Sequence, residues 1–384
     1  MADVALITSS FLPRIGGVEE HVRSVAALLR ERGVDVVVWT VDQGDDVPPM
    51  VDGVPVRVLP CPLPARTLRS LLSFAWRGPT AAIRWAMAVA RDRPAILHVH
   101  CFGPNGVWAM GAAIGRRLVV TSHGESTGDA TGALAGSVLL RWALRRALAR
   151  ADLVTAVAPS VVDDLVARFG LPAGTALIIA NGVDLDQAPG RQPPALPDRY
   201  VLGIGRLVDT KGFDLLLDAF ASARLPVDVG VVIAGDGLER SSLIERAARL
   251  GISDRVVLTG VLDRGQIVTV AAGATLLAVP SRVEAFGIVV LEGWRAGVPV
   301  IATDRGGPAD LIHDGVDGFL VDPSDRVEFS SVLERVFADP VLAGKIGLAG
   351  RARAAEFSWS AVVSAYSAAY ASLRNPGRPG SIGP

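Results

Sequence analysis

Short runs of apolar residues alternate along most of the chain with longer stretches in which apolar positions recur every three or four residues. A strand buried on both faces requires an unbroken apolar run, whereas a helix lying on a sheet requires only an apolar stripe. The alternation therefore predicts parallel sheets built from βαβ units. In the first half, the predicted strands are 4–8, 35–40, 54–59, 96–100, 118–122 and 153–157, and the clearest helices are 19–32 and 139–149.

The pattern stops at residues 187–199, which contain four prolines and a glycine and cannot hold a regular element. It then resumes with a second set of strands at 200–204, 229–234, 256–259, 275–279 and 299–302. A length of 384 residues suits two domains of this kind. We predict two Rossmann-like α/β domains that face each other across a cleft, with ligands at the carboxyl ends of the strands. The predicted parts are an N-terminal domain 1–187, a linker 188–199, a C-terminal domain 200–358, a helix 359–374 that returns to the first domain, and a disordered tail 375–384.

Composition narrows the class of protein. A formal net charge of −1 gives no general attraction to nucleic acid. The two cysteines, Cys61 and Cys101, suit no disulfide framework or metal motif, and we expect both to be ordinary residues of a protein in a reducing compartment. The N-terminus resembles a first strand rather than a signal peptide, and no apolar stretch reaches the length of a membrane span. We therefore expect a cytoplasmic protein that is at most peripheral at the inner face of the membrane.

The segment from Pro280 to Glu292 carries the clearest indication of a ligand site. A buried strand leads into a short loop, and a helix begins near Gly287. A helix N-terminus offers unpaired N–H donors and the positive end of a dipole, which suit phosphate or sugar hydroxyls. Glu284 on the loop and Glu292 on the helix could accept hydrogen bonds from vicinal hydroxyls, although two such glutamates alone could equally be solvated.

Two cations follow the first strand of the second domain. Arg206 comes directly after this strand, and Lys211, one of only two lysines in the chain, lies five residues further on. An arginine that binds in a bidentate manner beside a lysine suits a diphosphate, whereas the alternative is a pair of surface cations. The pair Gly16–Gly17 after the first strand of the chain would let backbone approach a phosphate, or would simply form a turn.

Three of the five histidines, His98, His100 and His123, fall at predicted strand ends, where catalytic groups gather. His98 and His100 share one face of their strand because side chains alternate along a strand, so the pair could ligate a metal. We expect no metal site, since no further ligand lies at a suitable spacing, and we expect His21 on a helix surface.

Together these segments resemble the family-four retaining glycosyltransferases with the GT-B fold, over nearly the whole chain. The motifs are GGVEEH at 16–21, HVH at 98–100, SHGE at 122–125, NGVD at 181–184, GRL and KG within 205–212, AGDG at 234–237, and the E-x7-E segment 284–292 with its GVPVIAT tail at 297–303. The last motif is the most specific of these.

The resemblance implies a role for each matching residue. Arg206 and Lys211 would hold the donor diphosphate, Glu292 would bind the ribose hydroxyls, and backbone around Val261 would meet the nucleobase. Glu284 would hold the transferred sugar together with the backbone of Phe286, Gly287 and Ile288. Gly16 and Gly17 would close over the phosphates, and His123 would lie beside the transferred sugar. We expect the acceptor in the N-terminal domain, with His98, His100 and Glu125 as candidate contacts.

The implied activity is transfer of a hexose or amino-hexose from a nucleotide diphosphate sugar, most simply UDP- or GDP-linked, to a hydroxyl acceptor. No metal cofactor is expected, because arginine, lysine and a helix dipole would neutralise the leaving diphosphate. The acceptor classes are a natural product, an inositol, a lipid-linked intermediate or a growing polysaccharide. Alternatives on the same fold are a sugar-nucleotide epimerase, a glycogen-type synthase and a non-catalytic nucleotide-sugar binding protein. A dehydrogenase is disfavoured because Gly203 and Gly205 lack the third glycine of a dinucleotide motif.

A basic region in the N-terminal domain raises the question of an anionic partner. Residues 66–150 contain twelve arginines and three acidic residues, and apolar side chains between 71 and 85 interleave with Arg69, Arg77 and Arg84. Such a surface would suit an anionic membrane or a phosphorylated acceptor, whereas the alternative is that the helices cover the sheet and turn their arginines to water.

Overall fold

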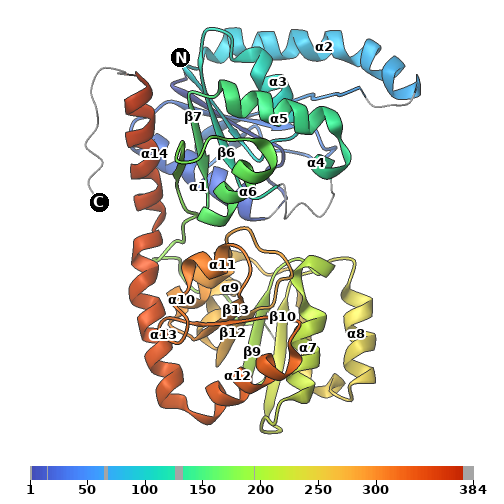
Figure 1. Cartoon of the computed structure of the whole chain (residues 1–384), viewed down its shortest axis with the longest axis vertical. Helices are drawn as coiled ribbons and strands as arrows, with labels where there is room; N and C mark the ends of the chain where they lie inside the picture. The colour runs from blue at the N-terminus through green and yellow to red at the C-terminus, as the bar shows by residue number, and fades with distance from the viewer. Residues whose placement is uncertain (1, 15, 65–67, 126–132, 194, 375–384) are drawn as a thin grey trace. The chain divides into compact units, whose positions relative to one another are not determined.

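The computed structural model describes residues 2–14, 16–64, 68–125, 133–193 and 195–374, and the side chains of residues 68–70, 133 and 135 also lie outside this description. The predicted disordered tail 375–384 lies outside the described residues. The chain forms two compact units (Figure 1). Unit 1 comprises Met1–Asn181 and Trp359–Pro384, and unit 2 comprises Gly182–Ser358.

Unit 1 is built on an eight-stranded sheet in the order β3-β4-β2-β1-β5-β6-β7-β8, parallel except for the β3–β4 pair. Its strands are β1 (Val4–Thr8), β2 (Val36–Val41), β3 (Met50–Val51), β4 (Val54–Leu59), β5 (Ile96–His100), β6 (Arg117–Ser122), β7 (Leu153–Ala156) and β8 (Ala176–Ile178). Its helices are α1 (Gly17–Glu31), α2 (Leu68–Asp92), α3 (Pro104–Ala112), α4 (Ala133–Gly136), α5 (Val138–Arg150), α6 (Pro159–Phe169) and α14 (Trp359–Arg374). The six predicted strands of this half are confirmed, whereas β3 and β8 are too short to show a periodic pattern.

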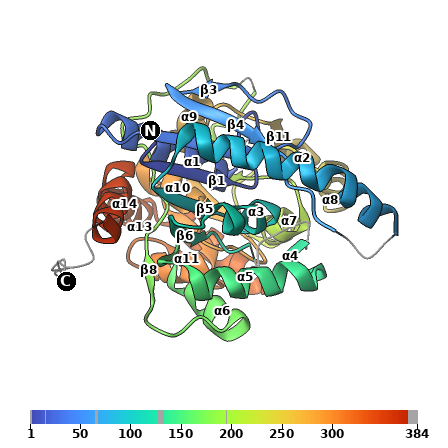
Figure 2. The ribbon, with the colours of Figure 1, turned by 90° about the horizontal axis from the view of Figure 1, so that it is seen from above.

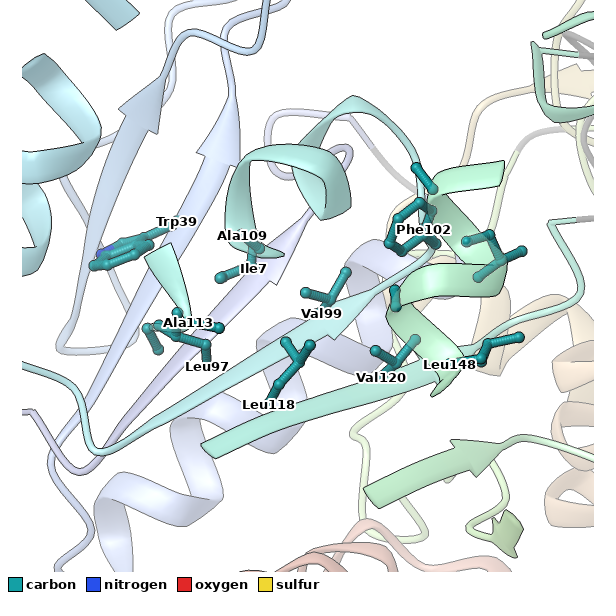
Figure 3. Close-up of a cluster of buried hydrophobic side chains, with 14 of the residues drawn as sticks. Ile7, Trp39, Leu97, Val99, Phe102, Ala109, Ala113, Leu118, Val120 and Leu148 are labelled. Atoms are coloured by element: carbon teal, nitrogen blue, oxygen red, sulfur yellow. The ribbon is translucent and has the colours of Figure 1, made fainter. Parts of the chain in front are cut away.

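Side-chain alternation gives the unit 1 sheet two apolar faces. On one face, Leu97 and Val99 of β5 pack with residues of α2, α3 and α5, and Figure 3 shows part of this cluster around Trp39, Phe102 and Leu118. On the other face, Ile96 packs with residues of α1 and α14. His98 and His100 belong to this second face because they follow Ile96 at intervals of two.

Helix α14 is part of unit 1 although it is the last helix of the chain. It lies beside α1, as both views show (Figures 1 and 2). The guanidinium of Arg32 donates to the hydroxyls of Ser360 and Ser364 at 2.9 Å each, and Tyr366 and Tyr370 are buried against the sheet. The predicted return of this helix to the first half of the chain is confirmed.

Unit 2 contains a six-stranded parallel sheet in the order β11-β10-β9-β12-β13-β14. Its strands are β9 (Arg199–Ile204), β10 (Val229–Ala234), β11 (Val256–Gly260), β12 (Leu276–Val279), β13 (Val300–Thr303) and β14 (Phe319–Val321). Its helices are α7 (Phe213–Ser222), α8 (Arg240–Arg249), α9 (Arg264–Ala272), α10 (Ile288–Ala296), α11 (Gly307–Leu311), α12 (Arg326–Ala338) and α13 (Pro340–Ala354), with short 3₁₀ helices η1 (Asp209–Lys211), η2 (Ser253–Arg255) and η3 (Ala355–Phe357). The five predicted strands are present, and β14 is an additional edge strand.

The segment between Asn181 and β9 belongs to unit 2. The backbone N–H of Gly190 donates to the carbonyl of Gly265 at 2.8 Å, and the Thr269 hydroxyl donates to the carbonyl of Gly190 at 2.8 Å. These contacts hold the proline-rich stretch against α9. In the described part of the chain, no helix is both long enough and apolar enough to cross a membrane.

Candidate functional site

In unit 2, the loop 280–287 connects the buried strand β12 to α10. Gly287 forms the N-cap of α10 with φ of 93°, in the left-handed region that glycine adopts without strain. The predicted start of this helix near Gly287 is therefore confirmed. The first N–H groups of α10, beginning at Ile288, lie at the positive end of the helix dipole and suit an anion. The Phe286 side chain is buried and packs near Phe357, so only its backbone is available to a ligand.

Glycines in neighbouring loops fix the backbone of loop 280–287. A Cβ at Gly212, where φ is 65°, would collide with the carbonyl oxygen of Pro280, and a Cβ at Gly306 would collide with the carbonyl oxygen of Glu284. The N–H of Gly307 donates to that same Glu284 oxygen at 2.9 Å. The loop therefore lies between two backbone segments that approach it more closely than any side chain would permit.

Lys211 and Glu284 meet at this loop. The Lys211 ammonium donates to Oε2 of Glu284 at 2.5 Å, and the buried Ser281 hydroxyl donates to the same oxygen at 3.1 Å. The two side chains are only 24% and 13% exposed, so solvent screens their attraction weakly. The structure thus brings together two of the predicted site residues, a cation and a carboxylate, beside the N-terminus of α10.

Arg206 lies on a second loop, directly after β9. This loop is fixed by backbone contacts: the N–H of Leu207 donates to the carbonyl of Asp236 at 2.9 Å, and a Cβ at Gly235 would collide with the carbonyl oxygen of Gly205. The Arg206 side chain is exposed, and within the described part of the chain it makes no hydrogen bond or ion pair. Its guanidinium is therefore available to an external anion.

Arg282 is a residue of this site that sequence reasoning missed. Its guanidinium donates to both carboxylate oxygens of Asp214 at 2.8 and 2.7 Å, and to the carbonyl of Asp209 at 2.7 Å. Burial acts to raise the pKa of Asp214. The hydrogen bond and the charge of Arg282 act to lower it, and the net shift of the pKa is downward. Arg282 thus ties loop 280–287 to η1 and α7, and its neighbours in sequence gave no indication of that partner.

Glu292 occupies the second turn of α10 and is half-buried. Burial raises the pKa of its carboxyl, while the charges of Arg295 and Arg264 oppose that rise. Arg264 begins α9, which packs against α10, and it lies in none of the sequence motifs. Val261 lies between β11 and α9 and is 65% exposed.

In unit 1, four imidazoles cluster on the face of the sheet covered by α1 and α14. His98 is hydrogen bonded through Nδ1 to the Tyr370 hydroxyl and through Nε2 to the Thr121 hydroxyl, at 2.6 Å each. His100 is hydrogen bonded through Nδ1 to Nε2 of His123 at 3.1 Å, whereas its own Nε2 is buried without a partner in the described part of the chain. The three predicted histidines therefore do lie together.

His21 completes this cluster, and the expectation that it lies on a helix surface is wrong. Its ring is fully buried, with Nδ1 hydrogen bonded to Asn181 Oδ1 at 2.7 Å and Nε2 to the Tyr366 hydroxyl at 3.1 Å. The surface of α1 that carries His21 is covered by α14, which comes from the far end of the chain. Burial lowers the pKa of all four imidazoles, that of His21 to about 4, so the cluster is neutral at pH 7.

Ring nitrogens of His21, His100 and His123 lie within 4.8 Å of one another, a grouping that could approach a metal ion. Both nitrogens of His21, however, already have hydrogen-bond partners, Asn181 and Tyr366. These histidines therefore form part of a hydrogen-bonded network, and the ring nitrogens of His21 are not free to bind a metal ion.

Glu125 organises the loop that carries His123. Its carboxylate accepts hydrogen bonds from the N–H of Phe102 at 3.0 Å, the N–H of His123 at 2.8 Å and the hydroxyl of Ser122 at 2.9 Å. It is 7% exposed, and burial raises its pKa against the opposing effect of these donors. The carboxylate is therefore occupied by two backbone N–H groups and the Ser122 hydroxyl of unit 1 itself.

Gly16 and Gly17 lie at the N-terminus of α1. Gly16 is the N-cap in an extended conformation, and α1 begins at Gly17 and continues for 15 residues. A Cβ at Gly16 would approach a carboxylate oxygen of Glu19 to 2.5 Å. A side chain at residue 16 would therefore collide with the Glu19 carboxylate, which lies beside the first turn of α1.

Two family models match successive parts of the chain. Residues 15–187 match the model of Glycosyltransferase Family 4, and residues 186–353 match that of Glycosyl transferases group 1. D-inositol 3-phosphate glycosyltransferase of Salinispora arenicola is 30% identical over 91% of this chain and 85% of its own length. GDP-mannose-dependent alpha-(1-6)-phosphatidylinositol monomannoside mannosyltransferase of Mycolicibacterium smegmatis is 29% identical over 90% of this chain and 92% of its own length.

Among solved structures, Anabaena Alr3699/HepE in complex with UDP superposes with a TM-score of 0.79 at 23% identity, over 97% of this chain and 100% of that one. This similarity and the two parallel α/β units confirm the predicted GT-B fold.

Proposed function

The chain belongs to the family of group 1 glycosyl transferases, with a family-four N-terminal half, and on this premise we propose that it moves a hexose or amino-hexose from a UDP- or GDP-sugar to a hydroxyl acceptor. It is a glycosyltransferase that uses a nucleotide sugar. The observation that carries the finer proposal is the Lys211–Glu284 pair, joined at 2.5 Å beside the N-terminus of α10. A cation, a carboxylate and free N–H donors meet there, which are the groups that a sugar diphosphate requires.

In this proposal, unit 2 binds the diphosphate of the donor through positively charged groups and the sugar through a carboxylate and backbone groups. Arg206, Lys211 and the first N–H groups of α10 hold the diphosphate, because positive charge is needed where the leaving group gains negative charge. Glu284 and the backbone of Phe286, Gly287 and Ile288 hold the hydroxyls of the transferred sugar. Lys211 would then exchange part of its contact with Glu284 for a phosphate oxygen.

The nucleoside lies further along α10. Glu292 accepts hydrogen bonds from the ribose hydroxyls, and the backbone around the exposed Val261 meets the nucleobase. Burial raises the pKa of Glu292, and the charges of Arg295 and Arg264 oppose that rise because they favour the ionised form, which can accept two hydroxyl donors.

We assign the reaction as retaining and independent of a bound metal. The supporting observation is the number of cationic groups of the protein itself at the loop: Arg206 is unpaired among the described residues, and Lys211 lies beside the positive end of α10. In a retaining reaction without a protein nucleophile, an oxygen of the leaving phosphate takes the proton of the acceptor hydroxyl on the same face of the sugar.

Unit 1 supplies the acceptor site in this proposal. His123, which is half-buried, would lie beside the transferred sugar, and Gly16 and Gly17 would let the N-terminus of α1 approach the phosphates. The hydrogen bonds of His98 and Glu125 to other groups of unit 1 favour a supporting role for both, and His100 holds the ring of His123. The relatives are named for inositol phosphate and phosphatidylinositol mannoside acceptors, which favours a phosphorylated or lipid-linked cyclitol here.

The donor site can be tested by thermal unfolding with UDP, GDP and ADP in EDTA. A nucleotide at about one hundred times its dissociation constant stabilises by about 2.7 kcal/mol, a clear shift of the unfolding temperature. We expect one nucleotide to stabilise the wild type and the variant Lys345→Ala, in which the only other lysine is replaced at an exposed position of α13. The same nucleotide should not stabilise Lys211→Ala.

Stabilisation that requires a divalent metal, or that survives in Lys211→Ala, would show that the diphosphate site is assigned wrongly. Incubation with a donor sugar alone separates the remaining functions. An epimerase would convert the sugar without an acceptor, and a non-catalytic binding protein would release nothing with any acceptor, whereas a transferase releases nucleoside diphosphate when the acceptor is added.

A further inference from the structure

Helix α2 has two apolar stripes on opposite sides. One is buried against unit 1 and comprises Gly78, Ala81, Trp85 and Ala88. The other faces away and is strongly exposed: Leu72 at 63%, Trp76 at 84%, Ile83 at 60% and Met87 at 65%. At 100° per residue, the exposed four fall within about 60° of one another and roughly opposite the buried stripe. A helix that only covered a sheet would carry polar residues at these positions.

A row of arginines runs beside the exposed stripe. Arg77, Arg84 and Arg91 are spaced by seven residues, which places them along one line of the helix, and all three are exposed. Residues 68–91 contain no acidic residue. Asp92, which ends the helix, is buried and accepts hydrogen bonds from the Arg57 guanidinium at 2.5 and 2.6 Å, so it does not offset the charge of the row.

Among the described residues of unit 1, none covers the exposed stripe. In both views α2 lies at the outside of the unit, and its first turns extend beyond the other elements of unit 1 (Figures 1 and 2). Helix α5, which packs on the same face of the sheet, has the same character: it contains four arginines and no acidic residue, and its Trp142 is 58% exposed. Helices α2 and α5 thus both carry exposed apolar side chains beside arginines on this side of the sheet.

We propose that the exposed stripe of α2, comprising Leu72, Trp76, Ile83 and Met87, inserts into the headgroup region of an anionic bilayer while the row Arg77, Arg84 and Arg91 binds lipid phosphates. A helix with an apolar stripe and arginines at its edge lies in the plane of a membrane interface, where tryptophan is favoured and each arginine adds attraction to anionic lipid. This association requires neither donor nor acceptor and does not rest on the donor site of unit 2.

A second copy of the chain is a poorer occupant for the same surface. In a two-fold symmetric dimer, α2 of one copy would face α2 of the other. The two rows of arginines would then repel each other, with no carboxylate of the helix between them. An anionic leaflet supplies the complementary charge along the whole row. Docking there would bring unit 1 to the surface where a lipid-linked acceptor would be held.

Vesicle flotation tests the proposal with the full chain. Vesicles of phosphatidylglycerol and phosphatidylcholine should carry the protein at low salt, vesicles of phosphatidylcholine alone should not, and binding should weaken as salt screens the charges. The double variant Arg77→Gln/Arg91→Gln should bind about 25-fold more weakly, since each arginine near the surface contributes about fivefold. The double variant Leu72→Ser/Trp76→Ser should bind at least about tenfold more weakly through loss of buried apolar area.

Matched variants in unit 2 provide the controls. Val227→Ser/Val341→Ser removes two side chains that are 90% and 83% exposed, and Arg249→Gln/Arg326→Gln removes two exposed arginines. Both should bind like the wild type, and all variants should keep the wild-type unfolding temperature. Equal binding to neutral vesicles, or binding unchanged in both α2 variants, would overturn the proposal. It would also be overturned by a wild-type dimer that Leu72→Ser/Trp76→Ser dissociates while no vesicle binds.

Discussion

Lys211 and Glu284 are 73 residues apart in the chain and 2.5 Å apart in the structure. Their motifs identified them as candidates, but each could have been a solvated surface charge. The pairing depends on Gly212 and Gly306, which let backbone approach loop 280–287, and on Arg282, which ties that loop to Asp214. The positions of the two predicted site residues therefore depend on Gly212, Gly306 and Arg282, none of which was predicted as a site residue.

Arg282 and Asp214 should be strongly coupled in stability. Their bidentate contact is partly buried, with side-chain exposures of 31% and 28%, so we expect a coupling energy of about 1–2 kcal/mol from the cycle Arg282→Gln, Asp214→Asn and the double variant. The pair Arg305–Asp322 also meets at 2.6 Å but is 51% and 33% exposed, and its coupling should stay below about 0.5 kcal/mol. Urea unfolding of the six variants measures both values, and equal couplings would contradict the role given to Arg282.

Loop 280–287 shows what determines an element's position. Its own residues predict a loop and a helix start, whereas its position comes from backbone contacts at Gly212, Gly306 and Gly307. No side chain fits at these points, so the contacts hold the N-terminus of α10 and Glu284 at fixed positions. The edge strands β8 and β14 were not predicted, because three residues are too few to show an apolar pattern. Their positions depend on pairing with the neighbouring strands.

Replacing Gly212 should therefore do more than strain its own backbone. Gly212→Ala places a Cβ against the Pro280 carbonyl at a φ of 65°, and we expect a loss of about 2–5 kcal/mol in the free energy of unfolding. Gly251 has a similar φ of 70° with nothing within 4 Å of its Cβ position, so Gly251→Ala isolates the backbone strain at about 1 kcal/mol. Nucleotide-induced stabilisation should be lost in the first variant and kept in the second. Similar losses of stability would mean that the Pro280 contact is unimportant.

The two units differ in their dependence on protonation. Four of the five histidines are in unit 1, where they form one neutral cluster under α14, and the fifth, His313, is an exposed side chain of unit 2. Because burial lowers the pKa of the cluster, the unfolded chain binds more protons than the folded chain once the pH falls below the unfolded value of 6.5. The stability from neutral histidines is present in full above that value and is lost as the pH falls toward the folded pKa.

Acid should consequently open unit 1 before unit 2. For His21, with a folded pKa of about 4, the loss between pH 7 and pH 5 is about 2 kcal/mol. Hydrogen exchange at pH 7 and pH 5, corrected for intrinsic rates, should show faster opening of α1, β5 and β6 at pH 5 than of β9 and β10. The variant His21→Gln should reduce that difference, and uniform acceleration across both units would contradict this account.

Local sequence patterns were enough to identify the secondary-structure elements and the fold class. The eleven predicted strands, the linkage of the last helix to unit 1 and the start of α10 followed from apolar periodicity and glycine placement, which act over a few residues. The motifs also identified a family whose GT-B fold the structure confirms. Local patterns suffice for these conclusions because backbone geometry and the need to bury apolar surface are themselves local constraints.

Contacts between distant segments control which polar groups pair within the protein and which remain available to a ligand. Periodicity indicated the apolar stripe of α1 but could not show that α14 covers His21, because the covering residues lie more than three hundred positions away. The same limit applies to the carboxylate of Glu125, which the loop backbone occupies, and to Arg282, whose partner is on α7. It applies also to α2, where only the packed unit distinguishes the buried stripe from the exposed one. Burial and pairing depend on contacts between distant segments, and a sequence specifies those contacts only once it is folded.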